Sequence, residues 1–266
     1  MERQTIWEGQ KPIVGVIHLL PLPGSPGWEG ELAPVLERCV AEALALEAGG
    51  LDGVLVENYR DAPFFPRSVP QETIAAMTLA VDAVRKAVKI PVGLNILRND
   101  AASALAVAAV TGAAFIRVNV HTGSMFTDQG LIQGQAHLTL RKRTALGSPV
   151  AILADVLVKH AVPPPGSVLE TAARDTWHRG LADGLILTGS ETGARVDREE
   201  IRRVKEALPP EARVWVGSGA TPETVRELLE QADGIIVGSA LQNEGIAGGG
   251  IDPRRVTRFM AAASRG

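Results

Sequence analysis

The chain has 266 residues, of which 45% are hydrophobic and only 4% aromatic, and its formal net charge is −3 at pH 7. This length fits one α/β barrel or two small domains, and the charge gives no electrostatic reason to expect a nucleic acid partner. Cys39 is the only cysteine, which excludes an intrachain disulfide and a cysteine-based metal cluster. No apolar run is long enough to span a bilayer, so we expect a cytoplasmic protein without a transmembrane segment.

Short apolar runs alternate with helical patterns from the start of the chain. The first half predicts strands at 13–18, 53–57, 91–96 and 115–120. Helices are predicted from about Leu32 to Ala48, along the face that carries Ile74 to Val88, and from an Asp100 cap to Gly112. The stretch 121–130 is expected to be a loop that opens from the fourth strand.

The second half continues the same alternation. A helix of undefined start ends at Gly147, and further strands are predicted at 150–155, 184–188, from Val214, and at 234–239. The remaining helices are expected to end at Gly180, to run from Asp197 to Pro209, to begin at Thr221 and Pro222, and to follow Asp252. The glycines at 248–250 are expected to form a flexible connection to the last helix.

Eight strand–helix units predict the fold class, a single (β/α)8 TIM barrel with a parallel eight-stranded sheet. No linker or composition shift divides the chain, so residues 1–266 are expected to form one domain. An open doubly wound sheet is the alternative, but no GxGxxG follows the first strand. The long loops follow the strands, which places the expected functional rim at the carboxyl ends of the strands.

Ionisable and amide side chains stand at the ends of several apolar runs. Glu57 and Asp155 are the best candidates for general acid and base, and His18 could share that role. Lys159 could form a Schiff base, as lysines of barrel aldolases do. The polar groups expected to bind substrate are Asn95, Arg117, Asn119 and Thr188.

Two further interpretations of the same side chains stay open. Glu57 and Asp155 could instead be neutralised by Arg117 and Lys159 in a purely structural ion-pair layer. Glu57, Asp155 and His18 could together hold a divalent cation, but no HxH or HExxH spacing supports a metal site. We therefore assign no metal ligands and leave the need for a cation open.

Paired glycine turns follow the last two predicted strands. Gly217, Ser218 and Gly219 come after the seventh strand, and Gly238 and Ser239 after the eighth. Glycine lets backbone N–H groups approach an anion closely, and (β/α)8 barrels bind phosphate after strands 7 and 8. The pair therefore predicts a phosphate site, although two ordinary turns would look the same in sequence.

Seven blocks of sequence resemble the BtpA family, which includes the SgcQ-type proteins. They lie at 11–26, 54–58, 95–100, 115–119, 128–132, 154–155 and 158–161. The resemblance implies a ribulose-phosphate-binding type of barrel. It leaves the activity open, because the cyanobacterial branch is named for a role in photosystem I accumulation, while other members occur in organisms without photosystems.

Two hypotheses for the function follow. The first is an enzyme that acts on a phosphorylated sugar, nucleotide or related metabolite by isomerisation, lysis or glycosidic-bond cleavage. The alternative is a non-catalytic stabilising or assembly factor of the photosystem I biogenesis type, which binds proteins at a membrane surface as a peripheral protein. A homo-oligomer is also expected, because symmetric oligomers are frequent and Pro-rich loops occur at 19–30 and 161–166.

Overall fold

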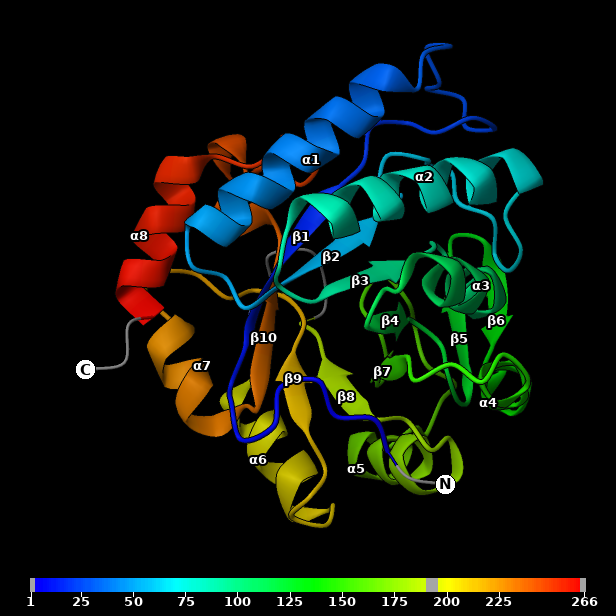
Figure 1. The fold of residues 1–266 in the computed structure, drawn as a ribbon. Coiled ribbons are helices and arrows are strands. Elements are labelled where there is room, and N and C mark those ends of the chain that lie inside the picture. Colours follow the sequence, from blue (N-terminus) through cyan, green and yellow to red (C-terminus); the bar gives the residue numbers. More distant parts are fainter. Residues whose placement is uncertain (1–2, 190–195, 264–266) are drawn as a thin grey trace.

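The computed structural model describes residues 3–189 and 196–263, and within them eight parallel strands close into a barrel (Figure 1). Their order is β1-β10-β9-β8-β7-β4-β3-β2, so the first strand pairs with the last. This closure confirms the predicted (β/α)8 barrel and excludes the open sheet. The strands span Ile13–His18 (β1), Gly53–Glu57 (β2), Val92–Asn95 (β3), Phe115–Val118 (β4), Ala151–Asp155 (β7), Gly184–Leu187 (β8), Val214–Val216 (β9) and Gly234–Val237 (β10).

Helices surround the ring of strands, and α1 packs beside both α2 and α8 (Figure 1). The α-helices of the described residues span Ala33–Ala48 (α1), Gln71–Ala87 (α2), Ala101–Thr111 (α3), Ala136–Ala145 (α4), Leu169–Arg174 (α5), Arg198–Glu206 (α6), Val225–Gln231 (α7) and Pro253–Ala263 (α8). A π-helix, Asp175–Arg179, continues α5, and two 3₁₀ turns, Ser239–Leu241 and Asn243–Gly245, follow β10. Among the described helices, none combines the length and apolar character that crossing a bilayer requires.

Side-chain caps set two of the helix starts where the sequence predicts them. The Asp100 carboxylate accepts a hydrogen bond from the Ser103 amide at 2.9 Å, and the Asp197 carboxylate accepts one from the Glu199 amide at 2.9 Å. Each satisfies an amide that the first helical turn leaves without a partner. The seventh helix differs from its prediction, because a turn at 222–224 intervenes and α7 begins only at Val225.

A β-hairpin occupies part of the stretch that was expected to be a loop after the fourth strand. Strands β5 (Ser124–Thr127) and β6 (Gly130–Gln133) pair antiparallel, and Gly130 closes the turn at φ +93°. Phe126 and Val162 exchange two backbone hydrogen bonds of 2.8 Å, so the hairpin is tied to the loop after β7. The prediction of a plain loop was wrong because four-residue strands with a two-residue turn give little periodic signal.

Trp7 closes the barrel interior at the amino ends of the strands. Its ring contacts those of Phe115 and Trp215, with centroids 5.5 Å apart in each case. The indole N–H donates to the Asp52 carbonyl at 2.9 Å, which satisfies the polar atom of a buried side chain. Gly53 is needed here, because a Cβ at that position would lie 2.7 Å from the Trp7 ring. Trp7, Phe115 and Trp215 thus form an apolar plug at the amino ends of the strands. The cavity of a functional site is therefore expected at the opposite end of the barrel.

We expect Trp7→Ala to lower the free energy of unfolding by about 3–5 kcal/mol, because it removes a large buried side chain and opens the barrel interior. Urea unfolding followed by far-UV circular dichroism measures the change. Phe126→Ala is the matched control, since that aromatic side chain on the hairpin is 50% exposed. Equal destabilisation by the two substitutions would contradict the role of Trp7 as a plug.

Candidate active site

A cavity of about 520 Å³ opens at the carboxyl ends of the barrel strands. Most of the side chains and glycines that the sequence nominated line this one cavity: His18, Glu57, Asn95, Arg117, Asn119, Lys159, Gly217, Ser218, Gly219, Gly238 and Ser239. Asp155 and Thr188 do not line it. The Asp155 side chain has no exposed area and lies behind Arg117, while Thr188 stands beside the backbone of Lys159.

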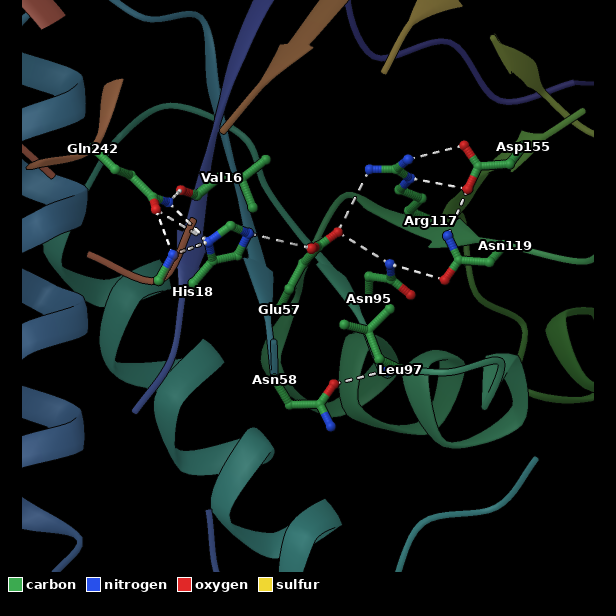
Figure 2. Close-up of polar contacts among 11 residues, drawn as sticks. Val16, His18, Glu57, Asn58, Asn95, Leu97, Arg117, Asn119, Asp155 and Gln242 are labelled. Carbon is green, nitrogen blue, oxygen red and sulfur yellow. Dashed lines mark hydrogen bonds and ion pairs between the residues drawn. The ribbon is translucent and has the colours of Figure 1, made fainter. Parts of the chain in front are cut away.

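Parallel register brings the first three site residues to the same level of the barrel. His18 is opposite Glu57 across β1 and β2, and Glu57 is opposite Asn95 across β2 and β3. Each is the last residue of its strand, and all three line the cavity at this end of the barrel. The Asn95 amide donates to Glu57 Oε1 at 3.0 Å, and this bond aims the carboxylate (Figure 2).

Arg117 and Asp155 form a buried ion pair with two hydrogen bonds (Figure 2). Arg117 Nε donates to Asp155 Oδ2 at 3.1 Å, and Nη2 donates to Oδ1 at 3.0 Å. The Asn119 amide donates to Asp155 Oδ2 at 2.6 Å, while Arg117 Nη1 lies 3.6 Å from Glu57 Oε1. Burial lowers the pKa of Arg117, but the charges of Asp155 and Glu57 outweigh it and the pKa is raised. Both oxygens of Asp155 thus accept hydrogen bonds from the protein. Of the two candidate acid–base carboxylates, Glu57 is the one that lines the cavity.

His18 is held as a neutral imidazole with its proton on Nε2. The Gly248 amide donates to His18 Nδ1 at 3.0 Å, and Gln242 Nε2 donates to the same atom at 2.9 Å. Since two donors point at Nδ1, that nitrogen is an acceptor, and the N–H of Nε2 faces Glu57 Oε2 at 3.7 Å. Burial lowers the pKa of His18 and outweighs the opposing charge of Glu57. Gly248, in the connection to the last helix, is therefore hydrogen-bonded to a residue of the site, a contact that was not predicted from the sequence.

The Lys159 amine lies in an unusual electrostatic environment. Burial, followed by the charge of Arg117, lowers its pKa from 10.5 to about 8, although Glu57 and Asp155 act in the opposite direction. Its backbone is anchored on both sides, because the amide donates to Thr188 Oγ1 at 3.0 Å and the carbonyl accepts from Arg98 Nη2 at 2.8 Å. A lysine with a pKa near 8 is unprotonated more often at neutral pH than an exposed lysine is. It is therefore more available as a base or a nucleophile.

Both glycine turns after the last two barrel strands line the cavity. Within the described residues, the N–H groups of Gly219, Ala220, Ser239 and Ala240 have no hydrogen-bond acceptor, although all four residues line the cavity. Gly219 has φ +74°, a conformation that glycine adopts without strain. Grouped N–H donors without partners are what an anion requires. The helix predicted to start at Thr221 starts further on, so its dipole adds little to this site.

Several residues that line the cavity or lie directly behind its wall were not nominated from sequence as site residues. Tyr59 stacks on His18 with ring centroids 4.1 Å apart, and Asp128 of the hairpin reaches the cavity. Gln242 is fully buried behind His18. Each belongs to a loop, where no strand periodicity points to the side that faces the site. The turn Asp128–Gly130 was the signal that could have located the hairpin.

The described residues hold no group of three or more histidine, cysteine, aspartate or glutamate side chains placed to bind a metal ion. Glu57 and His18 approach one another, but Asp155 faces Arg117 instead of joining them. The hypothesis of a cation held by these three side chains is therefore not supported by their placement.

A closed parallel barrel with a cavity at the carboxyl ends of its strands is the architecture of a TIM-barrel protein. Residues 9–265 match the BtpA family, and the chain belongs to this family. It is 50% identical over 260 residues to the photosystem I biogenesis protein BtpA of Synechocystis sp., covering 98% of this chain and 90% of that protein. The putative sgc region protein SgcQ of Escherichia coli is 30% identical, with 94% and 93% covered.

An uncharacterized protein of Pyrococcus abyssi is 42% identical over 94% of this chain and 95% of its own. Among solved structures, one described as native KDPGal has a TM-score of 0.60 at 15% identity, covering 97% of this chain and 95% of that one. The phosphoribosyl anthranilate isomerase of Thermus thermophilus has a TM-score of 0.57 at 13% identity, with 94% and 97% covered. At these identities the two structures support the fold alone.

Asp155→Ala is expected to lower the free energy of unfolding by about 3–5 kcal/mol, because it breaks a buried ion pair and leaves Arg117 with only its longer, 3.6 Å contact to Glu57. Urea unfolding measures the loss. Glu223→Ala is the control: it breaks an exposed ion pair with Arg258 of 2.9 Å and should leave stability nearly unchanged. A small effect of Asp155→Ala would show that the ion pair does not hold the mouth together.

Lys159→Met is expected to stabilise the protein at pH 7 by as much as about 3 kcal/mol, since folding lowers the pKa of Lys159 from 10.5 to about 8. The unfolded chain binds this proton more tightly. The free energy of unfolding of the wild type therefore increases as the pH rises from 8 to 10.5. The difference in stability between Lys159→Met and the wild type decreases across the same range. Urea unfolding across this pH range tests the difference. A stability difference that does not change with pH would contradict the lowered pKa.

Proposed function

We propose that this protein is an enzyme that acts on a phosphorylated sugar, nucleotide or related small metabolite. The observation that carries the proposal is that two turns with amides available for an anion open into the same cavity as the Glu57 carboxylate. A phosphate held by the turns would place the rest of a small substrate beside the polar side chains that line the cavity in Figure 2: His18, Glu57, Asn95, Arg117 and Asn119.

The charges around the cavity support an anionic ligand. Among the described lining residues, Arg98, Arg117 and Lys159 are basic, while Glu57 and Asp128 are acidic. Positive groups in a partly enclosed cavity attract a phosphorylated ligand and strengthen its binding. The Thermus thermophilus structural neighbour is named for a phosphoribosyl compound, which belongs to this ligand class.

The geometry gives the polar residues separate roles under this proposal. Glu57 is the group that exchanges a proton with the substrate, and the Nε2–H of His18 donates to the substrate or to Glu57. Asn95 aims Glu57, Asn119 offers a side chain to the substrate, and Arg117 supplies a fixed positive charge. Asp155 positions Arg117 and Asn119, and Thr188 positions Lys159. Isomerisation, carbon–carbon lysis and glycosidic-bond cleavage all remain compatible with these roles.

A stabilising or assembly factor is the second candidate function. Its support is the 50% identity to the Synechocystis photosystem I biogenesis protein over nearly the whole chain. A factor of this kind has no need for a reactive lysine, a neutral histidine and a carboxylate around one cavity. The two candidates are separated by whether the cavity binds phosphorylated compounds through the glycine turns.

Ser239→Asp is expected to weaken the binding of ribose 5-phosphate at least roughly tenfold, because it places a carboxylate among the amides that receive the phosphate. Isothermal titration calorimetry with ribose 5-phosphate and AMP, each compared with ribose and adenosine, measures the effect. Ser239→Ala is the matched control and should cost much less, since the amides remain. No binding of either phosphorylated compound to the wild type, or equal binding to wild type and Ser239→Asp, would contradict the phosphate site.

A further inference from the structure

Lys159 differs from the other lysines of the chain in its position at the cavity. It is the lysine that lines the cavity, and all other lysines of the chain, which also lie in the described residues, are outside it. No described carboxylate lies within 4 Å of its Nζ, and no described atom makes a hydrogen bond with the amine. Its neighbours Glu57 and Asp155 are engaged with Asn95, Arg117 and Asn119 instead.

The surroundings of the amine keep a reactive fraction available. Two guanidinium groups, those of Arg117 and Arg98, repel its proton, and burial disfavours its charge. With a pKa of about 8, about a tenth of the amine is unprotonated at pH 7. Desolvation together with neighbouring cations is how proteins activate lysine as a nucleophile. A lysine that only balanced charge would be expected to contact a carboxylate directly.

We propose that Lys159 forms an imine with the carbonyl carbon of a phosphorylated aldehyde or ketone bound in the cavity. The proposal rests on the proposed function for the phosphate anchor, and it narrows the substrate class to carbonyl compounds. The backbone amide of Lys159 donates to Thr188, and its carbonyl accepts from Arg98. These two hydrogen bonds fix the position from which the lysine side chain extends.

The step balances without an oxidant or reductant. The unprotonated Nζ attacks the carbonyl carbon and the C–N bond forms. The oxygen takes up one proton from the nitrogen and one from solvent, its bond to carbon breaks, and it leaves as water. The product is a protonated imine, which withdraws electrons from the neighbouring carbon. Glu57 then accepts a proton from that carbon or from a hydroxyl next to it, and the electron pair moves towards the imine nitrogen. Hydrolysis of the imine returns Lys159 and the carbonyl product.

Reductive trapping tests the proposal. The wild-type protein is incubated with glycolaldehyde phosphate and sodium cyanoborohydride, and peptide mass spectrometry locates the reduced adduct. We expect one adduct per chain at Lys159, with an initial rate that rises roughly tenfold from pH 6 to pH 7 and levels off above about pH 8. Lys159→Met should abolish this adduct, whereas Lys86→Met, at an exposed position of α2, should leave it unchanged.

The outcomes separate this proposal from the proposed function. If calorimetry shows binding of ribose 5-phosphate but the adducts fall only on exposed lysines, the imine proposal is overturned and the phosphate site stands. If glycolaldehyde without phosphate labels Lys159 as fast as glycolaldehyde phosphate, the lysine is a nucleophile but the phosphate anchor is wrong. Because the adduct is mapped on the wild type, the test does not depend on the folding of Lys159→Met.

Discussion

The ion pair between Arg117 and Asp155 is the interaction on which the mouth of the barrel depends. Asp155 ends β7 and Arg117 lies in β4, so their two hydrogen bonds join the side chains of two adjacent strands of the barrel. From this pair, contacts reach Asn119 and Glu57, and through Asn95 they extend to β3. Removing Arg117 would leave the buried Asp155 charge without its ion-pair partner, and removing Asp155 would leave Arg117 with only its 3.6 Å contact to Glu57.

A second set of contacts fixes the position of His18 and involves residues outside the barrel strands. Arg38 of α1 donates to the Gly248 carbonyl at 3.1 Å, and the Gly248 amide donates to His18. Gln242 accepts from the same amide and donates to the His18 ring. An outer helix, the loop after β10 and the imidazole are therefore connected. The tautomer of His18 is set by groups more than two hundred residues away in sequence.

The two ends of the barrel differ in the side chains that fill them. At the amino ends, Trp7, Phe115 and Trp215 fill the interior with large apolar side chains. At the carboxyl ends, Lys159 is kept in a setting that disfavours its charge, which costs stability. Proteins tolerate such unfavourable groups where function requires them and the rest of the fold compensates. The division agrees with a cavity used for chemistry, whereas a structural layer would be expected to pair every charge.

Sequence alone determined the barrel and most of its rim, because apolar runs with a strand period and glycine turns are local signals. It also placed His18, Glu57 and Asn95 at strand ends, since strand register follows the apolar pattern. Only the tertiary structure decided that Asp155 is engaged by Arg117 and that Glu57 faces the cavity. The difference arises because exposure, pairing and pKa depend on neighbours from distant strands and loops. The hairpin and Gln242 could not be located for the same reason: their positions follow from contacts between loops, which leave no periodic pattern in the chain.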